Sequence, residues 1–252
     1  MRLLPQPQEA SVLSWMRRFL VLAGVLFLMP HVEALAQSRG RNRAYYPLDH
    51  RAPTGTIAEW SARLSRSRAG YAQPVRVELP GEGRVTWFDG RQLRPIPMAV
   101  PAQVGLLVGH TYRLKISHMP EFPGVELYPS VEVLDRLHPP EGLKHEFPIP
   151  VHFTREEIEI ALRGNLVSRV IYLEQPQLAL PRQLDEDSRV TTVNPNLNLI
   201  AEADKLGRPM LIIRLGGRLP DSHGDNAAFF GSGARVTVSN ARTTVTEPEA
   251  AK

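Results

Sequence analysis

Cysteine is absent from the chain of 252 residues. A disulfide framework, a thiol nucleophile, a zinc–thiolate site and an iron–sulfur cluster are therefore excluded together. A bacterial lipid anchor, which is attached to a cysteine, is excluded as well. Without disulfides the folded part depends on its apolar core, which a domain of more than about 100 residues can supply.

Long apolar runs are scarce too. The longest one, Phe19–Met29, follows Arg17 and Arg18 and stops at Pro30. Crossing a bilayer takes about 20 apolar residues, so this run is too short for a membrane span. Its basic lead-in and its length are typical of a secretory signal peptide.

The predicted signal peptide covers residues 1–36, because Ala34-Leu35-Ala36 offers small residues at the cleavage positions. The mature protein then begins near Gln37, and Met16 is an alternative start of the chain. We expect an exported protein, periplasmic or secreted and associated with the cell envelope. No integral membrane span is expected after signal cleavage.

The motifs of several enzyme classes are also missing from the sequence. It has no G-x-S-x-G, no phosphate-binding glycine loop and no dinucleotide fingerprint. Ser222 and His223 are neighbours, and in an extended chain their side chains point apart. Paired carboxylates for glycoside hydrolysis stay open, since any two acidic residues can converge in a fold. No nucleic-acid-binding module is recognisable, so no nucleic acid partner is expected.

Residues 37–74 are rich in arginine and account for most of the formal net charge of +4. We expect a basic linker here that contains one short helix. Thr56–Glu59 has the spacing of a capping box, and Ile57, Trp60 and Leu64 then fall on one helical face.

The same segment holds the predicted partner-binding residues, Trp60, Arg63 and Arg66. The short helix either docks on the domain that follows or, with its aromatic side chain beside arginines, contacts a protein partner or an anionic surface. We therefore expect an envelope protein or an anionic polymer as the partner.

Two-residue alternation of apolar and polar side chains runs from Val75 to Leu173 and predicts strands. A hairpin is expected from 75–79 and 85–88 across the intervening Pro-Gly turn. Residues 104–119 read as one strand, with Tyr112, Leu114 and Ile116 on its buried face. In 125–133, Val131 and Val133 alternate with Ser130 and Glu132, which are expected to face water.

Later segments extend this pattern. Residues 147–153 predict an edge strand with outward prolines, and 166–173 predict a central strand because both faces are apolar. Thr154–Glu157 is a second capping box, which begins a short helix that Gly164 ends. Residues 175–198 predict an irregular crossing before a strand at 210–215.

These strands predict a mainly β domain over residues 75–220. We expect an antiparallel β-sandwich of immunoglobulin-like or transthyretin-like type with one or two short helices, and a barrel is the alternative left open. The 23 prolines support this class because they disfavour long helices. Residues 221–252 predict a flexible C-terminal tail with at most a weak strand at Val236–Val238.

Histidines and acidic loops are the candidates for metal ligation, although their spacing matches no established motif. The candidate ligands are His145, His152, Asp185, Asp187, Asp221 and Asp225. His110 and His118 also share a predicted strand face, but roughly 26 Å of strand separates them. No cofactor is expected.

Three segments, Phe122–Leu137, Phe147–Leu162 and Val170–Glu174, resemble exported proteins of unknown function found in planctomycete genomes. The resemblance covers roughly residues 70–220. It implies a secreted, envelope-associated bacterial protein and assigns no catalytic residues.

These patterns favour an exported, non-catalytic β-sandwich module with a binding or structural role in the cell envelope. One alternative is a metal- or ligand-binding secreted protein that uses the region from His110 to His152 or the acidic loops. Another is a secreted hydrolase with its site on the 175–208 crossing.

Overall fold

The computed structural model describes residues 47–48, 52–64, 70–176, 190–224, 226–231 and 233–238, all within the unit Tyr45–Lys252. The predicted signal peptide, Arg66, Asp185, Asp187 and Asp225 lie outside these residues. No helix in the described part is long and apolar enough to cross a membrane.

The described part of the chain is mainly β, as predicted. Its strands are β1 Ala72–Glu78, β2 Arg84–Asp89, β3 Arg94–Ala99, β4 Ala102–Leu107, β5 Thr111–Arg113, β6 Lys115–Ser117, β7 Ser130–Val133, β8 Ile149–His152, β9 Val167–Glu174, β10 Gly207–Leu215 and β11 Val236–Val238. Its helices are α2 Thr56–Leu64, η3 Lys144–Glu146, α3 Arg155–Leu162, α4 Leu199–Leu206 and α5 Ala227–Phe230.

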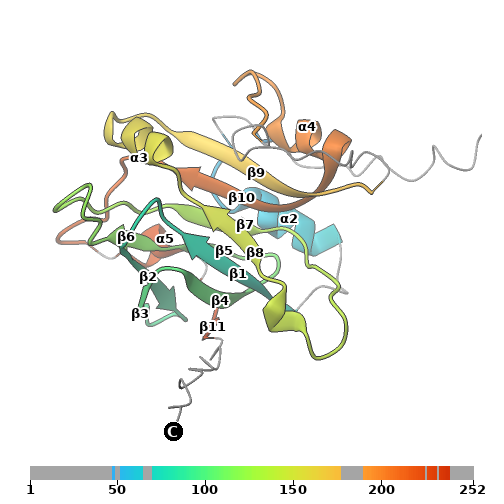
Figure 1. The fold of residues 1–252 in the computed structure, drawn as a ribbon, viewed down its shortest axis with the longest axis horizontal. Helices are drawn as coiled ribbons and strands as arrows, with labels where there is room; N and C mark the ends of the chain where they lie inside the picture. Colours follow the sequence, from blue (N-terminus) through green and yellow to red (C-terminus); the bar gives the residue numbers. More distant parts are fainter. Residues whose placement is uncertain are drawn as a thin grey trace, which may run out of the picture. The chain divides into compact units, whose positions relative to one another are not determined.

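These strands form three sheets, ordered β11-β4-β1-β8, β5-β7-β10-β9 and β3-β2-β6 (Figure 1). Neighbouring strands are antiparallel except β1 and β8, which run parallel. β11 is the weak strand predicted at Val236–Val238, and it pairs with β4. The short helix α5 precedes it, in a segment where only a flexible tail was expected.

One apolar core joins all three sheets. Its fully buried members include Val75, Val77, Trp87, Val104, Leu106, Ile116, Val131, Val133, Leu211 and Ile213. The predicted alternation of buried positions is therefore confirmed in β1 and around Tyr112, Leu114 and Ile116, and Val131 and Val133 of β7 are buried as predicted. Complete burial of so many branched side chains accounts for stability without disulfides.

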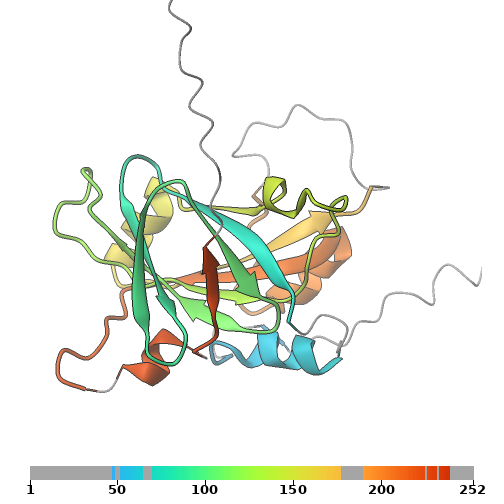
Figure 2. The same ribbon diagram turned by 90° about the horizontal axis from the view of Figure 1, so that it is seen from below.

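A second, smaller core lies on the other face of β7 and β10. Ile212 alternates with Leu211 and Ile213 and packs there against α2 and α4. The members of this core are Leu48, Ala52, Ile57, Ala58, Leu134, Ile200 and Ile212. In Figure 2 the blue helix α2 lies below the strands, and the orange helix α4 lies to the right, beside β9 and β10.

Several predictions for the region after β7 are confirmed. β8 is an edge strand with Ile149 and Val151 buried and Pro150 and His152 exposed. Thr154 and Glu157 form the predicted capping box, in which each side chain accepts a hydrogen bond from the other residue's backbone. These contacts satisfy N–H groups that a helix start leaves open.

The predicted strand partners are wrong in three places. β1 pairs with β4 and β8, whereas β2 pairs with β3 and β6, so no β1–β2 hairpin forms. The segment 104–119 divides into β4, β5 and β6, because Gly109 takes a φ of +83° and turns the chain. β9 is an edge strand rather than a central one.

One helix was missed and one prediction needs correction. Residues 177–189 of the predicted 175–198 crossing lie outside the described part, and 190–198 are irregular as predicted. The helix α4, which was not predicted, follows, and its N-cap Asn198 accepts a hydrogen bond from Ala201 N–H at 3.4 Å. Ser130 and Glu132, expected to face water, are buried with the rest of β7. Their face is outward from the main core, but α2 and its preceding residues cover it.

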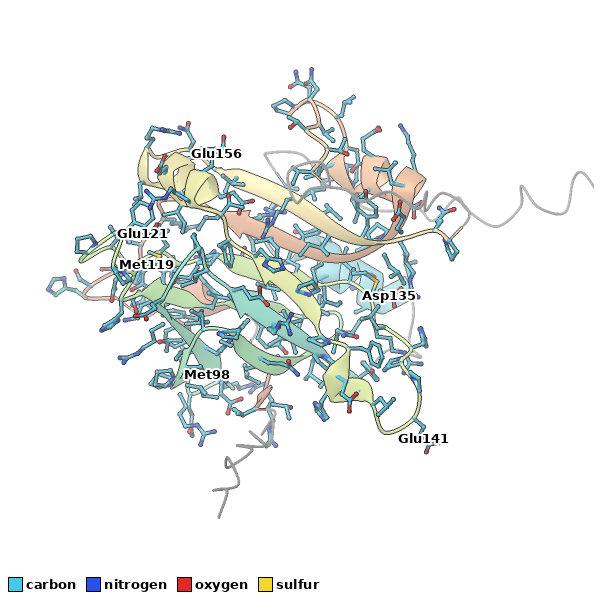
Figure 3. The ribbon with its side chains drawn as sticks, in the orientation of Figure 1. Met98, Met119, Glu121, Asp135, Glu141 and Glu156 are labelled. Carbon is cyan, nitrogen blue, oxygen red and sulfur yellow. The ribbon has the colours of Figure 1, made fainter. Side chains whose placement is uncertain are left out.

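Glu132 meets Arg214 on this covered face. Glu132 is 0% and Arg214 8% exposed, and Glu132 Oε1 lies 3.5 Å from Arg214 Nη2. Glu132 Oε2 accepts a hydrogen bond from Ala58 N–H at 3.4 Å, while Arg214 donates to the carbonyl of Ala52. The buried pair therefore ties the start of α2 to β7 and β10. Asp135, just beyond β7, is likewise buried and lies 3.4 Å from Arg208 (Figure 3).

Close approach of α2 also depends on Gly109. A Cβ at this position would lie 2.5 Å from the Cβ of Ala62. The Gly109 N–H donates to Val133 O at 2.7 Å, which fixes the turn beside the end of β7.

We predict that Gly109→Ala lowers the free energy of unfolding by about 1–3 kcal/mol more than Gly164→Ala. Both glycines have a φ of +83°, so both variants carry the same left-handed backbone penalty. Only Gly109→Ala adds a clash with α2, since a Cβ at Gly164 meets no atom within 4 Å. Urea unfolding measures the difference, and equal losses would contradict the packing of α2.

We also predict a pH dependence that Glu132→Gln removes. Burial raises the pKa of the Glu132 carboxyl above its ordinary value of 4.5, against the opposing effects of the Gly55 N–H, Arg214 and the Ala58 N–H. As pH rises above 4.5, the unfolded chain therefore ionises first, and wild type loses stability relative to Glu132→Gln. The slope cannot exceed about 1.4 kcal/mol per pH unit. The assignment would be refuted if the stability of wild type relative to Glu132→Gln stayed constant or increased as pH rises.

Candidate functional site

The outer face of α2 carries the predicted partner-binding residues that the structure describes. Trp60 is 39% and Leu64 62% exposed, and Arg63 beside them is exposed as well. Positions three and four residues apart are neighbours on a helix, so these side chains form one surface. We call Trp60, Arg63 and Leu64 the α2 face.

The other side of α2 differs from the prediction. Ile57 was expected to share a face with Trp60, but it is buried with Ala58 and Ser61 against the sheet. Small residues let the helix approach closely, and Ser61 Oγ donates to Leu134 O at 3.0 Å. Trp60 is thereby left on the side that faces away from β7.

The two described histidines among the metal-ligand candidates lie in different elements and have different contacts. His145 lies in η3, where its carbonyl accepts a hydrogen bond from Gln103 at 2.8 Å. His152 lies in β8, and its Nδ1 is 2.9 Å from a carboxylate oxygen of Glu78. Within the described ranges no group of three or more histidine or acidic side chains could hold a metal ion.

The Glu78–His152 pair belongs to a polar network between two sheet edges. Glu78 also lies 2.6 Å from Arg76. Arg169 of β9 donates to the carbonyl of His152 and lies 3.0 Å from Glu157. Burial lowers the pKa of Arg169, and Glu157 counteracts this effect. Arg169 thus joins β9 to β8 and α3, and Glu78 joins β1 to β8, which indicates a structural role.

The loop at Asp221 contradicts one expectation. Ser222 Oγ and His223 Nδ1 lie 2.8 Å apart, because the chain bends there instead of extending. Asp221 accepts a hydrogen bond from the backbone N–H of His223, at 3.0 Å. The carboxylate thus orients the loop backbone rather than the imidazole, and this is not the arrangement of a catalytic triad.

An aromatic and basic cluster that sequence reasoning missed surrounds α5. Phe229 contacts Phe230 and Tyr128, with ring centroids 5.2 and 5.7 Å apart, and Phe230 lies 3.9 Å from Phe88. The guanidinium of Arg113 lies over the Phe229 ring at 4.0 Å. We call Arg113, Tyr128, Phe229 and Phe230 the α5 cluster.

Hydrogen-bonding groups border the α5 cluster. Tyr128 donates to Glu126 at 2.7 Å, and Lys115 donates to the same carboxylate at 2.8 Å. The Lys115 hydrogen bond, followed by that of Tyr128, lowers the pKa of Glu126. Burial raises the pKa of Tyr128, and its bond to Glu126 adds to the effect.

Arg113 is the most perturbed cation of this cluster. Burial, together with the like charge of Arg218, lowers its pKa to about 10. Its Nε and Nη1 atoms are buried and have no hydrogen-bond acceptor among the described residues. The local signal for this site was the Phe229-Phe230 pair, whose apolar bulk is unusual in a segment rich in Gly and Ser.

Comparison with known proteins gives no match: no protein-family model, no curated protein and no solved structure is significantly similar to the chain.

We predict that Lys115→Met raises the pKa of Glu126 more than Tyr128→Phe does. Both substitutions remove a hydrogen bond to the carboxylate, but Lys115→Met also removes a positive charge that favours the ionised form of Glu126. NMR titration of the Glu126 carboxyl carbon measures both shifts. A larger shift in Tyr128→Phe, or none in either variant, would contradict the geometry at this position.

Proposed function

We propose that this chain is an exported, non-catalytic module of the cell envelope that acts by binding a partner through the α2 face. The predicted signal peptide and the resemblance to exported planctomycete proteins support the location. For the fold we propose a β-sandwich of immunoglobulin-like or transthyretin-like type. In its support, two four-stranded sheets contribute to one core.

The way α2 is held carries the proposal. One side of the helix is fixed by buried contacts to Glu132 and Leu134, while Trp60, Arg63 and Leu64 are exposed on the other. Tryptophan and arginine dominate the energetics of protein interfaces. A helix that is already rigid loses little conformational entropy on binding, so the α2 face is pre-organised for contact.

Charge favours an acidic counterpart. The segment that contains α2 is rich in arginine, and the chain has a formal net charge of +4. Basic surfaces attract acidic proteins and anionic polymers over a range set by ionic strength. An envelope protein or an anionic envelope polymer fits this requirement.

We predict that Trp60→Ala with Arg63→Ala abolishes capture of a specific partner from a solubilised envelope fraction of the source cells. Full-length protein serves as bait and unfolding is monitored in parallel. Trp60 is 39% exposed and Arg63 is exposed, so the loss of stability should stay within the ~0.5–3 kcal/mol that is usual for substitutions and leave the variant folded. Loss of a hot-spot tryptophan should weaken binding by at least about 2 kcal/mol.

The matched control is Leu173→Ala with Arg94→Ala, which removes one exposed apolar side chain and one exposed arginine elsewhere. This control should capture the partner as wild type does. Equal capture by the Trp60/Arg63 variant, or equal loss in the control, would exclude the α2 face as the contact. Hydrolytic activity that a single carboxylate or histidine substitution abolishes would overturn the non-catalytic proposal.

A further inference from the structure

The α5 cluster lies in a different part of the fold from the α2 face and has the chemistry of a second binding site. Arg113 belongs to β5, Tyr128 to the segment before β7, and both phenylalanines to α5. Contacts between their side chains gather them on one surface, although they are distant in sequence.

Arg113 carries a charge that no carboxylate among the described residues matches. A guanidinium that is partly removed from water costs free energy unless an anion compensates it. Arg113 has no carboxylate partner among the described residues, and Arg218 adds a second positive charge nearby. The neighbouring acid, Glu126, is already bound by Lys115 and Tyr128. An anionic ligand would remove this imbalance.

An aromatic surface lies beside that charge. Tyr128, Phe229 and Phe230 are each only partly buried. The π-face of such a ring carries negative potential. It therefore attracts the weakly positive C–H bonds on the face of a sugar ring. Aromatic walls with a few oriented polar groups are typical of small-molecule sites.

Polar side chains border the cluster. Glu126 and Lys115 have partly exposed side chains, 44% and 27%, and offer an acceptor and a donor. Hydroxyl groups need both kinds of partner. The ligand therefore needs three features in one molecule. It needs a carboxylate for Arg113, a C–H face for the aromatic rings and hydroxyl groups for Glu126 and Lys115.

We propose that the α5 cluster binds an acidic saccharide, with the sugar carboxylate on Arg113 and the ring face against Tyr128 and Phe229. Nη2 of Arg113 is not among the buried unpaired atoms, so a ligand oxygen reaches the guanidinium there. The carboxylate then makes a single-point contact through Nη2, and the Phe229 ring stays in place under the guanidinium.

The test is isothermal titration of the full-length protein with trigalacturonic acid, and with galactotriose and inorganic phosphate as comparison probes. Trigalacturonic acid should bind, and galactotriose should bind at least about tenfold more weakly because the charged hydrogen bond is lost. Inorganic phosphate should also bind at least about tenfold more weakly, since it has no ring face to contact the aromatics.

Variants assign the site. Arg113→Gln should weaken the binding of trigalacturonic acid by at least about tenfold. Arg218 is exposed, and Arg218→Gln should weaken this binding by about two- to fivefold. The matched control is Arg155→Gln, since Arg155 also lies over a phenylalanine ring, that of Phe122 at 5.9 Å. This control and the Trp60/Arg63 double variant should bind as wild type does.

Several results would overturn the proposal. One is no binding of trigalacturonic acid up to about 10 mM. Others are equal affinity for galactotriose or phosphate, or unchanged affinity in both Arg113→Gln and Arg218→Gln. If the Trp60/Arg63 variant lost saccharide binding, the α2 face and the α5 cluster would belong to one site, which would also refute the proposal of a separate site. Because Arg218 is exposed, its variant remains informative if Arg113→Gln does not fold.

Discussion

The buried ion pair between Glu132 and Arg214 is the contact on which the arrangement of the molecule depends. The two residues stand on paired strands, and their partners come from the chain before the first strand, at Ala52 and Ala58. A buried charge is tolerated only with such compensation, and removal of one partner strongly destabilises the fold. The pair therefore couples the placement of α2 to the integrity of β7 and β10. It also determines which side of α2 faces solvent.

This contact explains why the sequence analysis succeeded with strand faces and failed with solvent exposure. Alternation correctly separated Val131 and Val133 from Ser130 and Glu132. It could not reveal that α2 covers the second face, because that cover comes from residues far away in the chain. Strand pairing was unpredictable for the same reason. β1 bonds to β4 and to β8, and no local pattern identifies either partner. β3 was missed because Pro95 and Pro97 argue against a strand, although an edge strand tolerates them.

The functional surfaces show the same division. Trp60 and Arg63 were predictable because a helix places neighbouring turns side by side, and this rule needs no tertiary structure. The α5 cluster was not predictable, since Arg113, Tyr128 and Phe229 meet only after the sheets have formed. The predicted metal ligands illustrate the converse. His152 lies 2.9 Å from Glu78 because β1 and β8 are adjacent, which their sequence positions do not indicate.

Amide hydrogen exchange of α2 tests most directly whether the buried pair makes the helix part of the same cooperative unit as the sheet. The relevant probes are the amide of Ala58, which donates to Glu132, and that of Ile212 in β10. The account predicts that both open with nearly the same free energy, that of global unfolding. Exchange of Ala58 at a much lower opening free energy than Ile212 would show that α2 detaches on its own, which would contradict the account.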